Sequence, residues 1–185
     1  AGRVTIPIGG AQFQYDTVFR LRSGGTTRDA VALHFEDSTL AYATFDTTGL
    51  VPGDYTVEAE RTGVTVVSPV AVTIVTGQQG QITGRIVGPA ALRLGASDIL
   101  QVAFGNEGLT DVAIPLIRVS SPSGSPIAHL GRTPREQTIY MMAVSTDGPA
   151  EVLRPGQQIL VPLQFRAATE NTQFSVDFVE GTDTN

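Results

Sequence analysis

Two groups of oxygen-bearing side chains in this sequence have the chemistry of a cation site. The first group is Asn106, Glu107 and Asp111, and the second is Asp177, Glu180 and Asp183. Oxygen ligands on loops are what Ca²⁺ takes in proteins, so calcium is the one candidate cofactor and these six residues are its candidate ligands. The spacing matches no EF-hand. The alternative is that they are solvated carboxylates at strand ends, with Asn106 and Gly108 in a tight turn that uses positive φ.

Other catalytic chemistries lack their residues. The chain has no cysteine and no lysine, which excludes thiolate nucleophiles, Schiff-base lysines and a Walker lysine. It has two histidines, His34 and His129, and no G-x-S-x-G motif. The stretch FDTTGL at 45–50 differs by one residue from the D-T/S-G loop of aspartic proteases, and we expect Asp46 or Thr48 to cap local backbone there instead. We therefore predict a protein that is not an enzyme.

Composition and charge limit the kinds of binding partner that this chain can have. The formal net charge is −6 and the isoelectric point is about 4.8, so the surface repels nucleic acid and anionic headgroups. No apolar run approaches the roughly 20 residues that span a bilayer, and we expect no direct membrane insertion. Hydrophobic residues make up 41% of the chain, enough to build a folded core.

Short alternating runs of β-branched and aromatic residues dominate the chain and predict an all-β protein, because no window has apolar residues at helical spacing. The expected strands are 4–8, 17–22, 30–35, 40–45, 55–59, 70–75, 81–87, 98–104, 111–119, 138–144, 158–165 and 173–179. The polar, glycine-bounded stretch 76–81 divides them into six and about six. We predict two tandem immunoglobulin-like β-sandwiches, residues 1–77 and 78–185.

One device occurs in both halves. LVPGDYTV at 50–57 and LRPGQQIL at 153–160 each place a leucine before a Pro-Gly turn and a strand. The side chains of Leu50 and Leu153 are expected to be buried in the cores of the first and the second sandwich. Tyr55 has the position of the tyrosine in a tyrosine corner, whose hydroxyl bonds back to the upstream backbone, whereas Gln158 replaces it in the second half.

These motifs carry two resemblances. GGAQFQYDTVFRLR, DSTLAYATFDTTGLVPGDYTVEAE and VAVTIVTG, within residues 1–77, resemble the immunoglobulin-like IPT/TIG module. GPAALRLGASDILQVAFGNEGLTDVAIPLIRV and LRPGQQILVPLQF, within 80–167, are similar to CARDB-like adhesion modules. The resemblances imply a non-catalytic structural or adhesive spacer of a bacterial cell-surface or secreted multidomain protein. They also imply that its partners are neighbouring modules, other subunits, a carbohydrate or a surface protein.

The alternative function is a carbohydrate-binding accessory module of an extracellular hydrolase. It needs exposed aromatic side chains, and Tyr15, Tyr42 and Tyr140 are the candidates.

A further expectation concerns the sheet edge formed by the strand at 4–8. IPT/TIG modules usually have a strand ahead of the one at 4–8, so Ala1 is expected to lie inside a larger protein. The sandwich should therefore have an edge that invites pairing, limited by Pro7, which cannot donate to a ladder.

Overall fold

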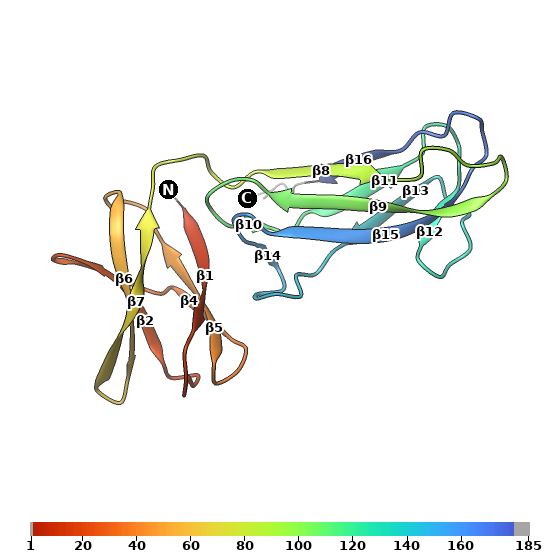
Figure 1. The fold of residues 1–185 in the computed structure, drawn as a ribbon. Coiled ribbons are helices and arrows are strands. Elements are labelled where there is room, and N and C mark those ends of the chain that lie inside the picture. The colour runs from red at the N-terminus through yellow and green to blue at the C-terminus, as the bar shows by residue number, and fades with distance from the viewer. Residues whose placement is uncertain (1, 180–185) are drawn as a thin grey trace, which may run out of the picture. The chain divides into compact units, whose positions relative to one another are not determined.

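The computed structural model describes residues 2–179, which form strands, turns and loops with no helix. The all-β prediction is confirmed. Within these residues no helix has the length and apolar character needed to cross a membrane. The chain forms two compact units (Figure 1). Unit 1 is Ala1–Gln81 with Gly108–Val112 and Ser145–Pro155, and unit 2 is Ile82–Glu107, Ala113–Val144 and Gly156–Asn185. Two short segments from the second half of the sequence thus belong to unit 1.

The part of unit 1 that precedes residue 81 forms two antiparallel sheets. Its strands are β1 (Arg3–Gly9), β2 (Val18–Ser23), β3 (Thr26–Asp29), β4 (Ala32–Phe35), β5 (Leu40–Asp46), β6 (Gly53–Arg61) and β7 (Val64–Ile74). One sheet has the order β1-β5-β4 and the other the order β3-β2-β6-β7. If β1 is equated with strand B of an immunoglobulin sandwich, these orders are B-E-D and C′-C-F-G. The place of strand A, beside β1, has no strand among the described residues.

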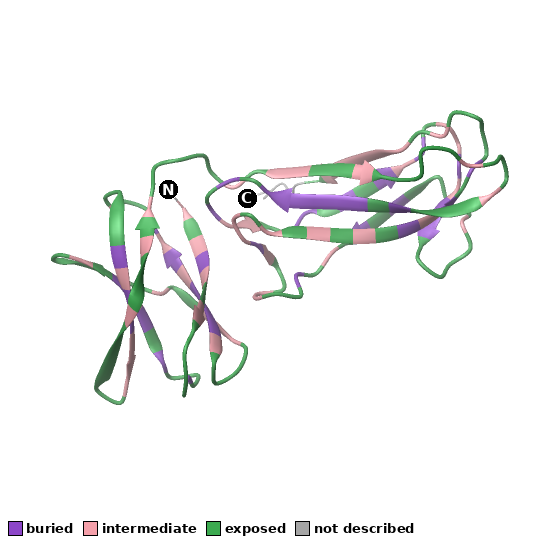
Figure 2. Cartoon of the chain, viewed as in Figure 1, coloured by how far each residue is buried: buried purple, intermediate pink, exposed green. Residues whose placement is uncertain are grey.

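The core of unit 1 lies between these two sheets (Figure 2). Phe19 and Leu21 of β2, Phe45 of β5, and Tyr55 and Val57 of β6 are buried together, because alternate residues of a strand point to the same face. Phe13, in the loop before β2, packs edge-on against Phe19 with ring centroids 5.2 Å apart. Leu50 is partly buried against the same cluster, as expected for the residue before the first Pro-Gly turn.

The predicted tyrosine corner is present. The hydroxyl of Tyr55 donates a hydrogen bond to the carbonyl oxygen of Val51 at 3.0 Å, across the turn between β5 and β6. Gly53 and Gly156, the glycines of the two Pro-Gly turns, have φ of 149° and 75°, values that a side chain rarely tolerates. The repeated sequence device therefore reflects two turns that both require glycine.

A Tyr55→Phe variant should lose about 0.5–1.5 kcal/mol of unfolding free energy, because it removes the hydrogen bond that holds this corner and keeps the buried ring. Urea denaturation of the full chain measures the loss. Tyr15→Phe is the control, since Tyr15 is 82% exposed and should change stability by no more than about 0.5 kcal/mol. Equal effects in the two variants would contradict the corner's role.

Unit 2 also contains two sheets. Its longer strands are β8 (Ile82–Val87), β9 (Ser97–Asn106), β11 (Leu116–Ser120), β13 (Thr138–Met142), β15 (Gln158–Arg166) and β16 (Ser175–Val179), and β12 (Ile127–His129) is short. One sheet has the order β12-β15-β9-β8 and the other β13-β11-β16. The rings of Phe104 on β9 and Phe178 on β16 lie 5.9 Å apart, so the two sheets share a core.

The structure departs from the expected strands in three ways. Strands β3, β12 and β14 (Val152–Leu153) were not predicted; they are short or polar and lack an alternating apolar pattern. The expected strand 111–119 is broken at Pro115 into β10 (Val112–Ala113) and β11, because proline cannot donate to a ladder. Strand β7 begins at Val64, six residues before the predicted start, and an irregularity opposite Thr56–Glu58 interrupts its pairing with β6.

Candidate functional site

Polar contacts in unit 1 attach the segment Gly108–Val112 to the outer edge of β1. The backbone N–H of Asp111 donates to the carbonyl oxygen of Arg3 at 2.8 Å. The carboxylate of Asp111 accepts the backbone N–H of Thr5 at 3.0 Å and the Thr5 hydroxyl at 2.6 Å. The Thr5 hydroxyl also lies 2.8 Å from that of Thr44 on β5. A single aspartate therefore occupies the backbone donor and acceptor that this edge of β1 presents at residues 3 and 5.

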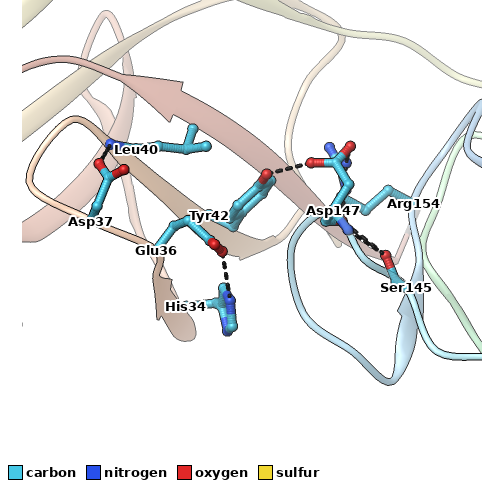
Figure 3. A network of polar contacts seen from close by, with 8 residues as sticks. All are labelled: His34, Glu36, Asp37, Leu40, Tyr42, Ser145, Asp147 and Arg154. Atoms are coloured by element: carbon cyan, nitrogen blue, oxygen red, sulfur yellow. Dashed lines mark hydrogen bonds and ion pairs between the residues drawn. The ribbon is translucent and has the colours of Figure 1, made fainter.

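A second cluster attaches the segment Ser145–Pro155 to β5 (Figure 3). The hydroxyl of Tyr42 donates to the carboxylate of Asp147, which also forms an ion pair with Arg154. The guanidinium of Arg154 lies over the Tyr42 ring, 5.0 Å from its centroid, a cation–π geometry. Gly148 has φ of 88°, and a Cβ there would stand 3.0 Å from the Tyr42 ring, so glycine suits this close approach.

The pKa shifts of this cluster favour a structural role over proton transfer. The hydrogen bond to Asp147 raises the pKa of the Tyr42 hydroxyl, and the same bond lowers the pKa of the Asp147 carboxyl. Near neutral pH the tyrosine therefore stays protonated and the aspartate stays ionised. A general acid or base needs a pKa close to the working pH, and these shifts move both groups away from it.

In the described part of the chain, the candidate calcium ligands either bind other side chains or belong to different units. Asp111 binds Thr5 in unit 1, whereas Asp177 of unit 2 pairs with Arg118 at 2.8 Å. Asn106 is a buried residue of unit 2, and Glu107 is exposed. Glu180 and Asp183 lie outside the described residues. Residues 2–179 contain no group of three or more His, Asp or Glu side chains that could hold a metal ion, and calcium binding stays a prediction.

The Asn106–Gly108 stretch differs from its predicted tight turn. Neither residue has a positive φ. Glycine is needed at 108 for another reason, because a Cβ there would stand 2.1 Å from the carbonyl oxygen of Gln79. This close backbone approach holds Gly108 against the segment that follows β7, within unit 1, and the sequence pattern contained no signal for it.

The remaining candidates have ordinary surroundings. His34 lies on β4, 3.4 Å from Glu36, and His129 is the last residue of β12. Asp46 accepts the backbone N–H of Thr48 at 2.9 Å, which confirms the predicted local cap.

One prediction about aromatic side chains is wrong. Tyr42 was a candidate for an exposed aromatic residue, but it is only 3% exposed because Arg154 and Asp147 cover it. Tyr15 and Tyr140 are exposed and belong to different units.

Unit 1 also contains an apolar groove that no sequence motif indicated. It has a volume of about 810 Å³ and is lined by β1, by the loop that follows it, by β6 and by β7. Its apolar lining includes Ile6, Ile8, Phe13, Val57, Val66, Val70 and Val72. The signal available in the sequence was the uncharged, valine-rich stretch that begins at Val64. The lining is mostly aliphatic and also includes the polar or charged side chains of Thr17, Glu60, Arg61 and Ser68.

Comparisons with protein-family models, with curated proteins and with solved structures find no match for this chain.

Proposed function

We propose that this chain is a non-catalytic structural and adhesive spacer, built from an IPT/TIG-like module followed by a CARDB-like module, in a bacterial cell-surface or secreted multidomain protein. The observation that carries the proposal is that polar side chains of unit 1 make structural contacts between its segments. Asp111, Asp147 and Arg154, from distant parts of the sequence, all hold peripheral segments on β1 and β5. The immunoglobulin-type strand order of unit 1 supports the same proposal.

A spacer has to stay folded under tension, so force spectroscopy tests the proposal. The full chain, held between two handles, should unfold in discrete events and refold when relaxed. The event for the span from β1 to β7, residues 3–74, should release roughly 250 Å of contour length, at about 3.6 Å per extended residue. Smooth extension without a discrete event would contradict a load-bearing role.

The carbohydrate alternative makes a different prediction for the same protein. It needs aromatic side chains gathered on one face, and the exposed Tyr15 and Tyr140 belong to different units. A glycan array probed with the full chain should therefore show no binding. Binding that is lost in Tyr15→Ala or Tyr140→Ala would assign the chain to the carbohydrate-binding class instead.

A further inference from the structure

Asp147 and Gly148 form the one Asp-Gly pair in the sequence, and the chain has no Asn-Gly pair. In such a pair the backbone nitrogen of the glycine can attack the carboxyl carbon of the aspartate, because glycine has no Cβ to shield its nitrogen. The new N–C bond closes a succinimide ring, and the carboxyl hydroxyl leaves as water. Water then opens the ring. Breaking the new bond restores aspartate, whereas breaking the original peptide bond leaves isoaspartate, whose main chain runs through the former side chain.

The structure holds both carbonyl groups that this reaction involves (Figure 3). The carboxylate of Asp147 accepts the hydroxyl of Tyr42 and pairs with Arg154. The backbone carbonyl oxygen of Asp147 accepts the Ser145 hydroxyl at 2.9 Å and the Arg154 guanidinium at 3.3 Å. Ring closure removes one carboxyl oxygen and draws the other into the ring, so these contacts have to break first. Hydrogen bonds between ionised groups are among the stronger ones in proteins, and the contacts therefore oppose the reaction.

The same contacts keep the carboxyl group in its unreactive form. The hydrogen bond from Tyr42 lowers the pKa of the Asp147 carboxyl. An ionised carboxylate is a poor target for the glycine nitrogen, because its oxygen has to be protonated before it can leave as water. The side chain of Asp147 is nevertheless 63% exposed, so water can reach the ring once it has formed.

Isoaspartate at position 147 does not fit the contacts that aspartate makes there. Its main chain contains an additional carbon, and its carboxylate is attached directly to Cα. The guanidinium of Arg154 lies over the Tyr42 ring, and a Cβ on Gly148 would stand 3.0 Å from that ring. Such a close approach leaves no space for a longer main chain between Asp147 and Gly148. The isomer therefore loses the contacts that attach the segment Ser145–Pro155 to β5.

We propose that Asp147–Gly148 is a latent modification site, whose conversion to isoaspartate detaches the segment Ser145–Pro155 from β5. The contacts of Asp147 with Tyr42 and Arg154 set the rate of this conversion. The inference goes beyond the proposed function and does not rest on it, because the chemistry depends only on this segment and on β5.

Peptide mapping of the full chain by mass spectrometry tests the proposal. The protein is kept at neutral pH for several weeks, and isoaspartate is detected by the failure of a protease that cleaves before aspartate to cleave before residue 147. Ring closure requires local opening of the segment, so its rate follows the population of the open form. Tyr42→Phe keeps the ring and removes the hydroxyl, and it should raise the rate about tenfold, because the open form no longer competes with this hydrogen bond.

Two variants are controls for this measurement. Tyr55→Phe also removes one tyrosine hydrogen bond in unit 1, but its partner is Val51 and not Asp147. It should change the rate by less than about twofold, because it does not alter the local opening of the segment. Asp147→Glu identifies the site, since its longer side chain closes a larger ring far more slowly, and isomerisation at 147 should disappear.

Hydrogen exchange on the isomerised chain, separated by ion-exchange chromatography, tests the detachment. The amide of Ser145 bonds to the carbonyl oxygen of Ala150, and that of Val152 to the carbonyl oxygen of Pro149. Both amides should exchange about tenfold faster once the segment has left β5, because they then belong to a loop without its anchor.

Three results would overturn the proposal. The first is no isoaspartate at 147 even in the chain unfolded by urea, which would make this pair unreactive. The second is no acceleration in Tyr42→Phe, or the same acceleration in Tyr42→Phe and Tyr55→Phe, which would leave the contact with Asp147 without a specific effect. The third is unchanged exchange of the Ser145 and Val152 amides in the isomerised chain, which would show that the segment stays attached.

Discussion

A Phe19→Ala variant should lose about 3–5 kcal/mol of unfolding free energy, the cost of removing a large buried aromatic side chain and leaving a cavity. Phe19 is almost fully buried on β2 and contacts Phe13 edge-on, so both the burial and the ring contact are lost. A natural domain has only about 5–15 kcal/mol of stability in total. The loss should therefore move the urea midpoint of unit 1 strongly, and amides of β2 and β6 should exchange faster.

Val18→Ala is the matched control for this prediction. Val18 precedes Phe19 on the same strand and its side chain is exposed on the opposite face, so its truncation should cost no more than about 0.5 kcal/mol. A shift of one residue in the pairing of β2 would exchange the two faces. If Val18→Ala were the more damaging change, the register between β2 and β6 would be wrong.

An Asp111→Ala variant should lose about 1–3 kcal/mol, because it leaves the backbone N–H of Thr5 without its acceptor at a buried position. The Thr5 hydroxyl loses the same partner but keeps its contact with Thr44. Urea denaturation measures the loss, and hydrogen exchange at the Thr5 amide should accelerate. If the Thr5 amide stayed protected in Asp111→Ala, the edge of β1 would not depend on this aspartate.

Asp111→Asn separates the charge of this side chain from its hydrogen bonds and gives a pH test. Burial raises the pKa of the Asp111 carboxyl above its ordinary value. Its contribution to stability is therefore fully present below the unfolded pKa of about 3.9, and it is lost as the pH rises through the folded pKa. The stability of Asp111→Asn relative to the natural chain should accordingly increase between pH 4 and pH 7. A difference that stays constant over this range would contradict the buried, destabilised carboxylate.

Two other carboxylates of the same unit have lowered pKa values, so their contributions to stability change with pH in the opposite direction to that of Asp111. Hydrogen bonds from Thr39 lower the pKa of Asp37, and the Tyr42 hydroxyl lowers that of Asp147. Their contributions are present above the unfolded pKa and are lost as the pH falls through the lowered folded value. Comparing Asp111→Asn with the natural chain removes these shared contributions, so the difference isolates Asp111.

Local patterns in the sequence determined the all-β class and most strand positions. Alternation along β2, β5 and β6 specified which residues are buried, because a strand has two faces and only one packs on the core. The Pro-Gly turns and the Tyr55 corner could also be predicted from the sequence, because each depends on residues within a few positions of one another.

Only the tertiary structure decided which distant polar groups meet. Asp111 is 106 residues from Thr5, and Asp147 is 105 residues from Tyr42, and no periodicity relates such pairs. The sequence motifs predicted that Asp111 is a calcium ligand and that Tyr42 is exposed. The local sequence around a loop carboxylate or a single tyrosine is the same whether the side chain binds a ligand or holds two segments together. The groove likewise depends on β1 and β7 being edges of facing sheets, and these edges are set by how the strands from β1 to β7 pair.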